Sequence, residues 1–322
     1  MCARCLFQRS GKKTDKSKSM QTVRLGYRDA DRAPVIFAIQ EMARCDYDLN
    51  VSVVQIKDEA AYEAALFNNS ADVIIEHLEY LYEKAAQGKK ITMFCAPSKG
   101  GGLHLIVPQH LRSTEELRGK TMAVRTSGQP YAITLWLRMM GLEKEVRTLM
   151  VTDKEVGRWC QWKKVVNGEC AATFMSPLYL PQALAAGLKV IQVPEIPIIG
   201  HFAQACLSEF TKKQPEIMVQ YVKSTLRALV WLTARRNEAF FALAPELKAC
   251  MKLDDAELKR RFDSIVDGIK TKPYPTPEAI SNTHEIATLE YAGAKEVNPM
   301  SLWDLHWVKQ LDDEGFIDGL VP

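Results

Sequence analysis

The chain has 322 residues, of which 47% are hydrophobic, and its 42 Lys and Arg against 39 Asp and Glu leave a net charge of +3. This length allows two domains, and the composition is that of a globular protein, which excludes a collagen-like or wholly disordered chain. The near-neutral charge gives no sign of a nucleic-acid or membrane-surface partner, so we expect a small molecule or a protein as the partner.

The first part of the chain alternates between two kinds of apolar pattern. Strands are predicted at residues 22–27, 49–55, 71–75 and 90–96, and helices at 33–44, 59–68 and 79–87. Strands that alternate with helices are typical of βαβ units and of a parallel sheet buried on both faces. The pattern therefore predicts an α/β fold.

A second α/β set follows, and long helices follow it. Strands are predicted at 103–107, 121–124, 146–151, 171–175 and 189–193, with helices at 131–140, 155–167, 177–186, 215–235, 238–244, 254–266 and 276–292. We expect three parts: a basic flexible arm (1–21), a first lobe (22–105 with 202–322, including the C-terminal helices) and a second lobe (106–201).

The N-terminal segment 1–19 is basic and has no apolar stretch of the length that a secretory signal requires. A cytoplasmic location is therefore predicted, or a periplasmic one if the start of the chain is misassigned; Met20 is an alternative start. The eight cysteines are scattered, which favours a reducing compartment over a disulfide framework. Cys2 and Cys5 form a CxxC without the two further ligands of a zinc site, so no metal is expected.

Ligands of parallel sheets lie beyond the carboxyl ends of the strands. In the second lobe this rule selects the loop of Thr126, Ser127, Gly128 and Gln129, where backbone N–H groups before a helix can bind an anion. An ordinary helix cap is the alternative. The loop matches neither GxGxxG nor a P-loop, so no nucleotide cofactor is predicted.

In the first lobe the same rule selects Glu76 and His77, which could act as a general base or bind a metal. Neighbouring residues of a strand point to opposite faces, so the two side chains are expected to converge on one atom only if the chain turns there. A surface histidine is the alternative. Trp159 and Trp162 are expected on one face of a helix, where packing is favoured over a ligand platform.

Three runs resemble a known superfamily. ELRGKTMAVRTSGQPYAITLWLRMMGL and VVNGECAATFMSPLYLPQALAAGLKVI are similar to the second lobe of type II periplasmic-binding-protein-like proteins, the alkanesulfonate, taurine and nitrate group of ABC transporter substrate-binding proteins and the thiamine-pyrimidine synthases. FNNSADVIIEHLEYLYEKAAQGKKITMF looks like the first-lobe counterpart. The resemblance implies two α/β lobes that close on a small molecule in a cleft at the hinge, with a transporter membrane component as a partner and no direct membrane insertion. It implies ligand contacts at Asp29, Glu76, His77, Thr126, Ser127, Gly128, Gln129 and Ser176.

The sequence departs from this superfamily at several points. Ala171 replaces the usual strand-end acid, and the CCCFC and Asn-His motifs of the thiamine-pyrimidine synthases are absent, which argues against iron-dependent synthesis. The expected function is binding of an anionic or heteroaromatic small molecule. The alternative is a cytosolic lyase similar to dihydroxyphthalate decarboxylase, acting on an aromatic or heterocyclic carboxylate with His77, Glu76 or His201 as the acid.

Overall fold

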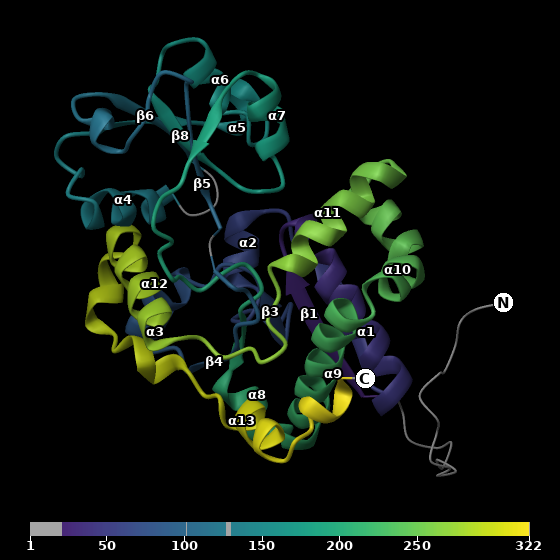
Figure 1. The fold of residues 1–322 in the computed structure, drawn as a ribbon. Helices are drawn as coiled ribbons and strands as arrows, with labels where there is room; N and C mark the ends of the chain where they lie inside the picture. Colours follow the sequence, from purple (N-terminus) through teal and green to yellow (C-terminus); the bar gives the residue numbers. More distant parts are fainter. Residues whose placement is uncertain (1–20, 101, 127–129, 322) are drawn as a thin grey trace. The chain divides into compact units, whose positions relative to one another are not determined.

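The computed structural model describes residues 21–100, 102–126 and 130–321 (Figure 1). The chain forms two compact units. Unit 1 comprises Met1–Ser98, Gly200–Pro275 and Met300–Pro322, and unit 2 comprises Lys99–Ile199 and Thr276–Pro299. The predicted N-terminal arm lies outside the described residues except for Gln21.

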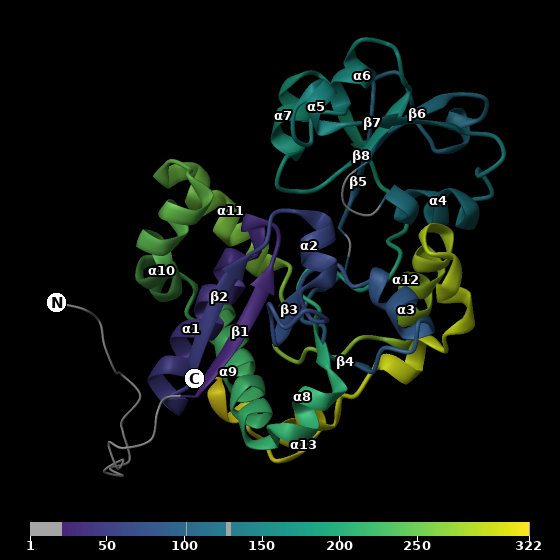
Figure 2. The same ribbon diagram turned by 180° about the vertical axis from the view of Figure 1, so that it is seen from behind.

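Unit 1 is built on a five-stranded sheet in the order β2-β1-β3-β10-β4. Its strands are β1 (Thr22–Tyr27), β2 (Asn50–Gln55), β3 (Val73–Ile75), β4 (Ile91–Cys95) and β10 (Gln204–Leu207). Strand β1 runs parallel to β2 and β3, and β1 and β2 lie side by side in Figure 2. Strand β10 runs antiparallel to both β3 and β4.

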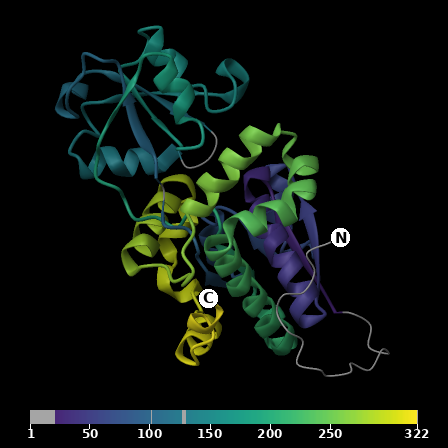
Figure 3. The same ribbon diagram turned by 45° about the vertical axis from the view of Figure 1, so that its right-hand side comes forward.

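The helices of unit 1 cover this sheet because its strands are apolar on both faces; all five residues of β4 are buried. The helices are α1 (Ala33–Tyr47), α2 (Glu59–Ala64), α3 (Tyr80–Ala86), α8 (Ser208–Lys213), α9 (Pro215–Ala234), α10 (Arg236–Met251), α11 (Asp255–Asp267) and α13 (His306–Asp313). Helix α1 has Pro34 in its first turn, ends at Asp48 in the left-handed conformation and packs against α9 (Figure 3).

Unit 2 has a sheet in the order β7-β6-β8-β5-β9. The strands are β5 (His104–Val107), β6 (Thr121–Arg125), β7 (Arg147–Val151), β8 (Ala172–Met175) and β9 (Lys189–Ile191). Strand β6 is parallel to β7 and β8, whereas β5 is antiparallel to β8 and β9. The helices are α4 (Pro130–Met139), α5 (Asp153–Val156), α6 (Trp162–Val166), α7 (Leu180–Ala185) and α12 (Pro277–Glu290).

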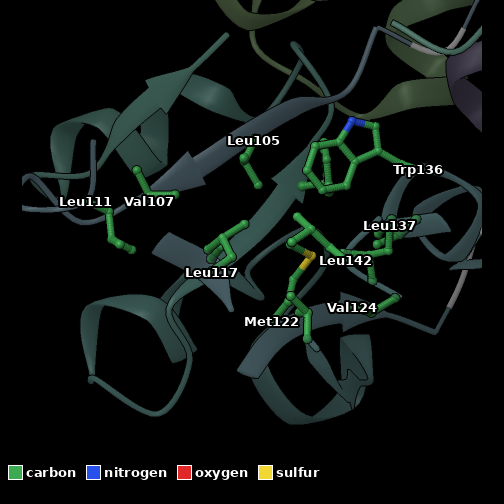
Figure 4. Packing of buried hydrophobic residues seen from close by; sticks show 13 residues of the cluster. Leu105, Val107, Leu111, Leu117, Met122, Val124, Trp136, Leu137 and Leu142 are labelled. Carbon is green, nitrogen blue, oxygen red and sulfur yellow. The ribbon is translucent and has the colours of Figure 1, made fainter. Parts of the chain in front are cut away.

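Alternate residues of the strands of unit 2 enter two different cores, as the two-residue period of a strand requires. Leu105 and Val107 of β5 pack with Trp136 and Leu137 of α4 (Figure 4). Ile106, between them, belongs to the opposite cluster with residues of α6 and α7. The sheet is therefore covered on both faces, as the sequence predicts for an α/β fold.

Three predicted features differ from the structure. The predicted helix 155–167 is two short helices, α5 and α6, because Gly157 (φ 94°, ψ 157°) and Trp159 (φ 56°) take non-helical conformations between them. Strand β10 lies in a segment for which no strand was predicted. The segment Thr276–Pro299 belongs to unit 2, whereas the sequence analysis placed it in the first lobe.

The packing of α12 explains this last difference. Helix α12 packs against α4, and its Ile286 shares a buried cluster with Leu135. The side chain of Asn282 donates a hydrogen bond to the carbonyl of Pro197, and the Thr283 hydroxyl accepts one from the N–H of Ile199. No helix in the described part of the chain is both long and apolar enough to span a membrane.

Leu137→Ala is expected to destabilise unit 2 by about 2–5 kcal/mol, because Leu137 is 2% exposed and its removal leaves a cavity in the core. Met139→Ala, in the same helix but at a side chain 56% exposed, serves as the control and should change stability by less than about 0.5 kcal/mol. Urea unfolding followed by circular dichroism measures both. Equal effects of the two substitutions would contradict the assignment of Leu137 to the core.

Candidate functional site

Polar side chains from three strand ends meet at one edge of the unit 1 sheet. Strands β1 and β3 are parallel, so Asp29 after β1 and Glu76 after β3 lie at the same edge. Strand β10 is antiparallel to β3, which brings His201, three residues before it begins, to this edge as well. The backbone N–H of Glu76 donates to the carbonyl of Ala203 at 3.3 Å and fixes this crossing.

A buried ion pair joins the loop after β1 to the end of β3. The Arg32 guanidinium donates to Oε1 of Glu76 through Nε at 2.8 Å and also through Nη2. Both side chains are less than a tenth exposed. Burial lowers the pKa of Arg32, but Glu76, Asp29 and Asp31 together outweigh it and the pKa is raised, so the guanidinium stays charged.

The backbone of Asp29 supplies a further hydrogen bond to Glu76. Its N–H donates to Oε2 of Glu76 at 3.2 Å, while its own carboxylate accepts from the N–H of Asp31 and caps the short 3₁₀ helix η1 (Ala30–Arg32). Burial raises the pKa of Glu76, and the bonds from Arg32 and Asp29 oppose this effect. The carboxylate is thus held by donors on both oxygens.

His77 and His201 form a direct pair. Nδ1 of His201 and Nε2 of His77 lie 2.7 Å apart, and the two rings meet edge to face with centroids separated by 4.2 Å. One of these nitrogens carries the hydrogen and the other accepts it. Nδ1 of His77 lies 3.9 Å from Oε1 of Glu79.

Both imidazoles are held in the neutral form. Burial lowers the pKa of His77 well below its usual value. Repulsion between the two imidazoles, which would arise if both were protonated, and the charges of Arg32 and Arg28 lower it further. Burial and the charge of Arg32 do the same to the pKa of His201. At neutral pH the pair therefore offers nitrogen lone pairs rather than positive charge.

Two further cations lie around this cluster. Arg28, with a side chain 22% exposed, pairs with Glu59, whose side chain is 72% exposed. Arg261 of α11 pairs with the buried Asp31 at 3.2 Å. Glu76, His77 and His201 also offer potential metal-ligand atoms that all lie within 4.8 Å of one another.

The structure brings three of the predicted contact residues together: Asp29, Glu76 and His77. The turn that Glu76 and His77 need in order to converge is present, because β3 ends at Ile75 and the chain bends at Glu76. His201 was not predicted as the partner of His77. This pairing would be expected if β10 were recognised as an antiparallel neighbour of β3. In an antiparallel pair, the residues that precede one strand lie beside the residues that follow the other strand.

The predicted contacts of the second lobe lie in unit 2. Ser127, Gly128 and Gln129 fall outside the described residues. Thr126 is exposed and follows β6, and its N–H donates to the carbonyl of Val151. Ser176 follows β8 and accepts a hydrogen bond from the N–H of Leu178 at 3.4 Å. Their role in ligand binding stays a prediction.

Trp159 and Trp162 both pack against other residues, as the sequence analysis favours, but they do not lie on one helix. Trp159 lies before α6 and stacks on Tyr179 with an interplanar angle of 14°. The guanidinium of Arg125 lies 4.7 Å from the Trp159 ring centroid and also pairs with Asp153. Both tryptophans pack against the cluster that covers one face of the unit 2 sheet.

No protein-family model and no curated protein matches the sequence. Solved structures match over most of the chain. The periplasmic sulfonate-binding protein SsuA from Methylobacillus flagellatus KT has a TM-score of 0.69 at 15% identity, covering 93% of this chain and 96% of its own. The periplasmic aliphatic sulphonate binding protein SsuA from Escherichia coli has a TM-score of 0.63 at 16% identity, covering 85% of this chain and 88% of its own.

The conserved CA3427 gene product of Candida albicans, described as having the generic periplasmic binding protein fold, matches with a TM-score of 0.57 at 14% identity, covering 91% of this chain and 95% of its own. These likenesses show that the chain has the periplasmic-binding-protein fold, in agreement with the superfamily that the sequence resembles. At this level of identity they show the fold alone.

Arg32→Met is expected to destabilise the protein by about 3–5 kcal/mol, because it leaves the charge of Glu76 buried without its partner. Arg118→Met, at an ion pair with Glu145 whose side chains are both 47% exposed, is the control and should leave stability almost unchanged. Chemical unfolding compares the two variants. A cost for Arg32→Met as small as that of the control would contradict the buried pair.

The histidine pair predicts a loss of stability in acid. The folded-state pKa values of both rings lie below the unfolded value of about 6.5, so the pair's contribution is complete above that pH. Below it, the unfolded chain gains protons that the folded chain does not, and each histidine lowers the free energy of unfolding by up to about 1.4 kcal/mol per pH unit.

This dependence can be measured by unfolding between pH 7 and 5.5 in a buffer that contains a chelator. The double variant His77→Gln/His201→Gln should show a shallower slope than the wild type, whereas His110→Gln, at an exposed histidine, should keep the wild-type slope. An unchanged slope in the double variant would show that the two rings are not held neutral.

Proposed function

We propose that this chain is a small-molecule-binding protein whose ligand carries an anionic group, and that the ligand binds at the edge of the unit 1 sheet where Arg28, Asp29, Glu76, His77 and His201 meet. The observation that carries the proposal is this gathering of polar groups from three separate strand ends. Such a cluster is not needed for the stability of the fold. Burying charged side chains carries a large desolvation cost, which apolar side chains at the same positions would not have.

Arg28 is the cation that we assign to the anionic group of the ligand. Its partner Glu59 is largely exposed, and a pair of this kind contributes little, so an incoming carboxylate or sulfonate can replace Glu59 at low cost. Arg32 is fully engaged with Glu76, as judged by its two hydrogen bonds to one carboxylate oxygen, and it positions that carboxylate. The sulfonate-binding proteins among the structural neighbours support an anionic ligand.

The lyase alternative draws no support from the histidine pair. Protonation of a carbon that loses carbon dioxide needs an acid that holds a proton at neutral pH. The lowered pKa values of His77 and His201 leave both rings neutral there, so neither is suited to this role. We therefore propose binding without turnover. The transporter partner and the cytoplasmic location stay predictions.

The test is a panel of alkanesulfonates, aromatic sulfonates and aromatic carboxylates, examined by thermal shift and then by calorimetry. A true ligand at 100 times its dissociation constant should stabilise the fold by about 2.7 kcal/mol. Arg28→Gln should weaken binding at least tenfold, and Glu59→Gln should strengthen it, because the competing carboxylate is removed.

Arg44→Gln is the control: this surface arginine of α1 is paired with Glu41, and its loss should leave affinity unchanged. A panel in which no compound stabilises the protein would overturn the proposal. Equal affinity of Arg28→Gln and Arg44→Gln would remove Arg28 from the site. Conversion of the ligand to a decarboxylated product, detected by mass spectrometry, would establish the lyase instead.

A further inference from the structure

We propose that Glu76, His77 and His201 form a binding site for a divalent transition-metal ion of the zinc class, with two imidazole nitrogens and one carboxylate oxygen as ligands. Sequence reasoning predicted no metal here because it separated Glu76 from His77 and did not place His201 beside them. The inference is independent of the proposed function, since it requires no small molecule.

The two imidazoles already face a common point. Nδ1 of His201 and Nε2 of His77 are 2.7 Å apart. Two nitrogens bound to one zinc ion at about 2.0–2.1 Å lie roughly 3.0–3.4 Å from each other, so the rings need to separate by only a few tenths of an ångström. The hydrogen between them moves to the other nitrogen of its ring, and both ligands remain neutral.

The carboxylate of Glu76 keeps a lone pair for the ion. A carboxylate accepts about four hydrogen bonds. Arg32 fills Oε1 with two, and the N–H of Asp29 supplies one to Oε2 at 3.2 Å. Oε2 therefore retains one lone pair, and the bonds from Arg32 hold the group in place while it binds.

Glu79 lies close to the ring nitrogen of His77 that would not bind the metal. Metal-binding histidines almost always donate their second ring N–H to a carboxylate, a carbonyl or water. Nδ1 of His77 is buried and has no hydrogen-bond partner among the described residues, and Oε1 of Glu79 lies 3.9 Å from it. A shift of about 1 Å would complete a carboxylate–histidine–metal arrangement.

The donor set selects the kind of ion. Imidazole nitrogens suit zinc and its neighbours in the first transition row, whereas magnesium and calcium prefer oxygen ligands throughout. The charge of the nearby Arg28 and Arg32 opposes any cation, which favours ions that imidazole binds strongly. Three protein ligands also leave a coordination position open.

The experiment uses the full chain, stripped with a chelator and titrated with zinc chloride by calorimetry. Because Cys2 and Cys5 could bind zinc on their own, the titration is repeated on Cys2→Ser/Cys5→Ser, and one ion per chain should still bind. His77→Gln and His201→Gln should each weaken this binding at least tenfold. Glu79→Gln should weaken it about 10- to 100-fold. His110→Gln, at an exposed histidine, should leave it unchanged.

Cobalt substitution gives a second measurement that does not depend on whether the histidine variants fold. Cobalt bound by the Cys2→Ser/Cys5→Ser chain should show ligand-field absorption without the charge-transfer band of a thiolate ligand. Magnesium in excess should not displace it.

The proposal is overturned by any of three results. All three are measured in the Cys2→Ser/Cys5→Ser background. The first is failure to bind one zinc ion, which would place the ion at the N-terminal cysteines. The second is binding that survives when His77→Gln or His201→Gln is added and the chain still folds. The third is thiolate charge transfer from the bound cobalt.

Discussion

The Arg32–Glu76 pair is the interaction on which the candidate site depends. Two opposite charges are removed from water at the point where the loop after β1 meets the end of β3. Neither charge is tolerable there alone, so each fixes the position of the other. Glu76 in turn receives the N–H of Asp29 and lies beside His77, and the hydrogen bond between Glu76 and Ala203 sets the start of β10. The geometry of the histidine pair follows from this constraint.

The sheets of the two units have the same arrangement of strands. When the antiparallel strand is left out of the count, the other four strands of each sheet lie in the order second, first, third, fourth. The antiparallel strand, β10 in unit 1 and β5 in unit 2, lies between the third and the fourth. In unit 1 the antiparallel strand β10 follows the segment Lys99–Ile199, which belongs to unit 2, in the chain. A residue such as His201 can therefore reach a site whose other members lie near residues 29 and 76.

Sequence periodicity predicted the parallel strands well and the antiparallel strand of unit 1 not at all. Strand β1 has the predicted bounds, because six alternating or apolar residues lie between clear turn signals. Strand β10 has four residues, Gln204–Leu207, and leads directly into α8, so no period identifies it. The sequence left open whether the chain turns at Glu76, because the end of β3 depends on its pairing with neighbouring strands and not on its own sequence. The break at Trp159 depends on its stacking with Tyr179, a contact that sequence spacing does not contain.

The two proposals share Glu76, His77 and His201, and their electrostatics are complementary. Arg28 and Arg32 make this edge of the sheet positive, while the neutral imidazoles add lone pairs but no charge. A cation held by the histidine pair would increase the positive potential and leave an open coordination position. An anionic ligand on Arg28 would offset that potential and could fill the open position. On physical grounds, each of the two bound species therefore stabilises the other, which is the thermodynamic condition for positive coupling between metal and ligand binding.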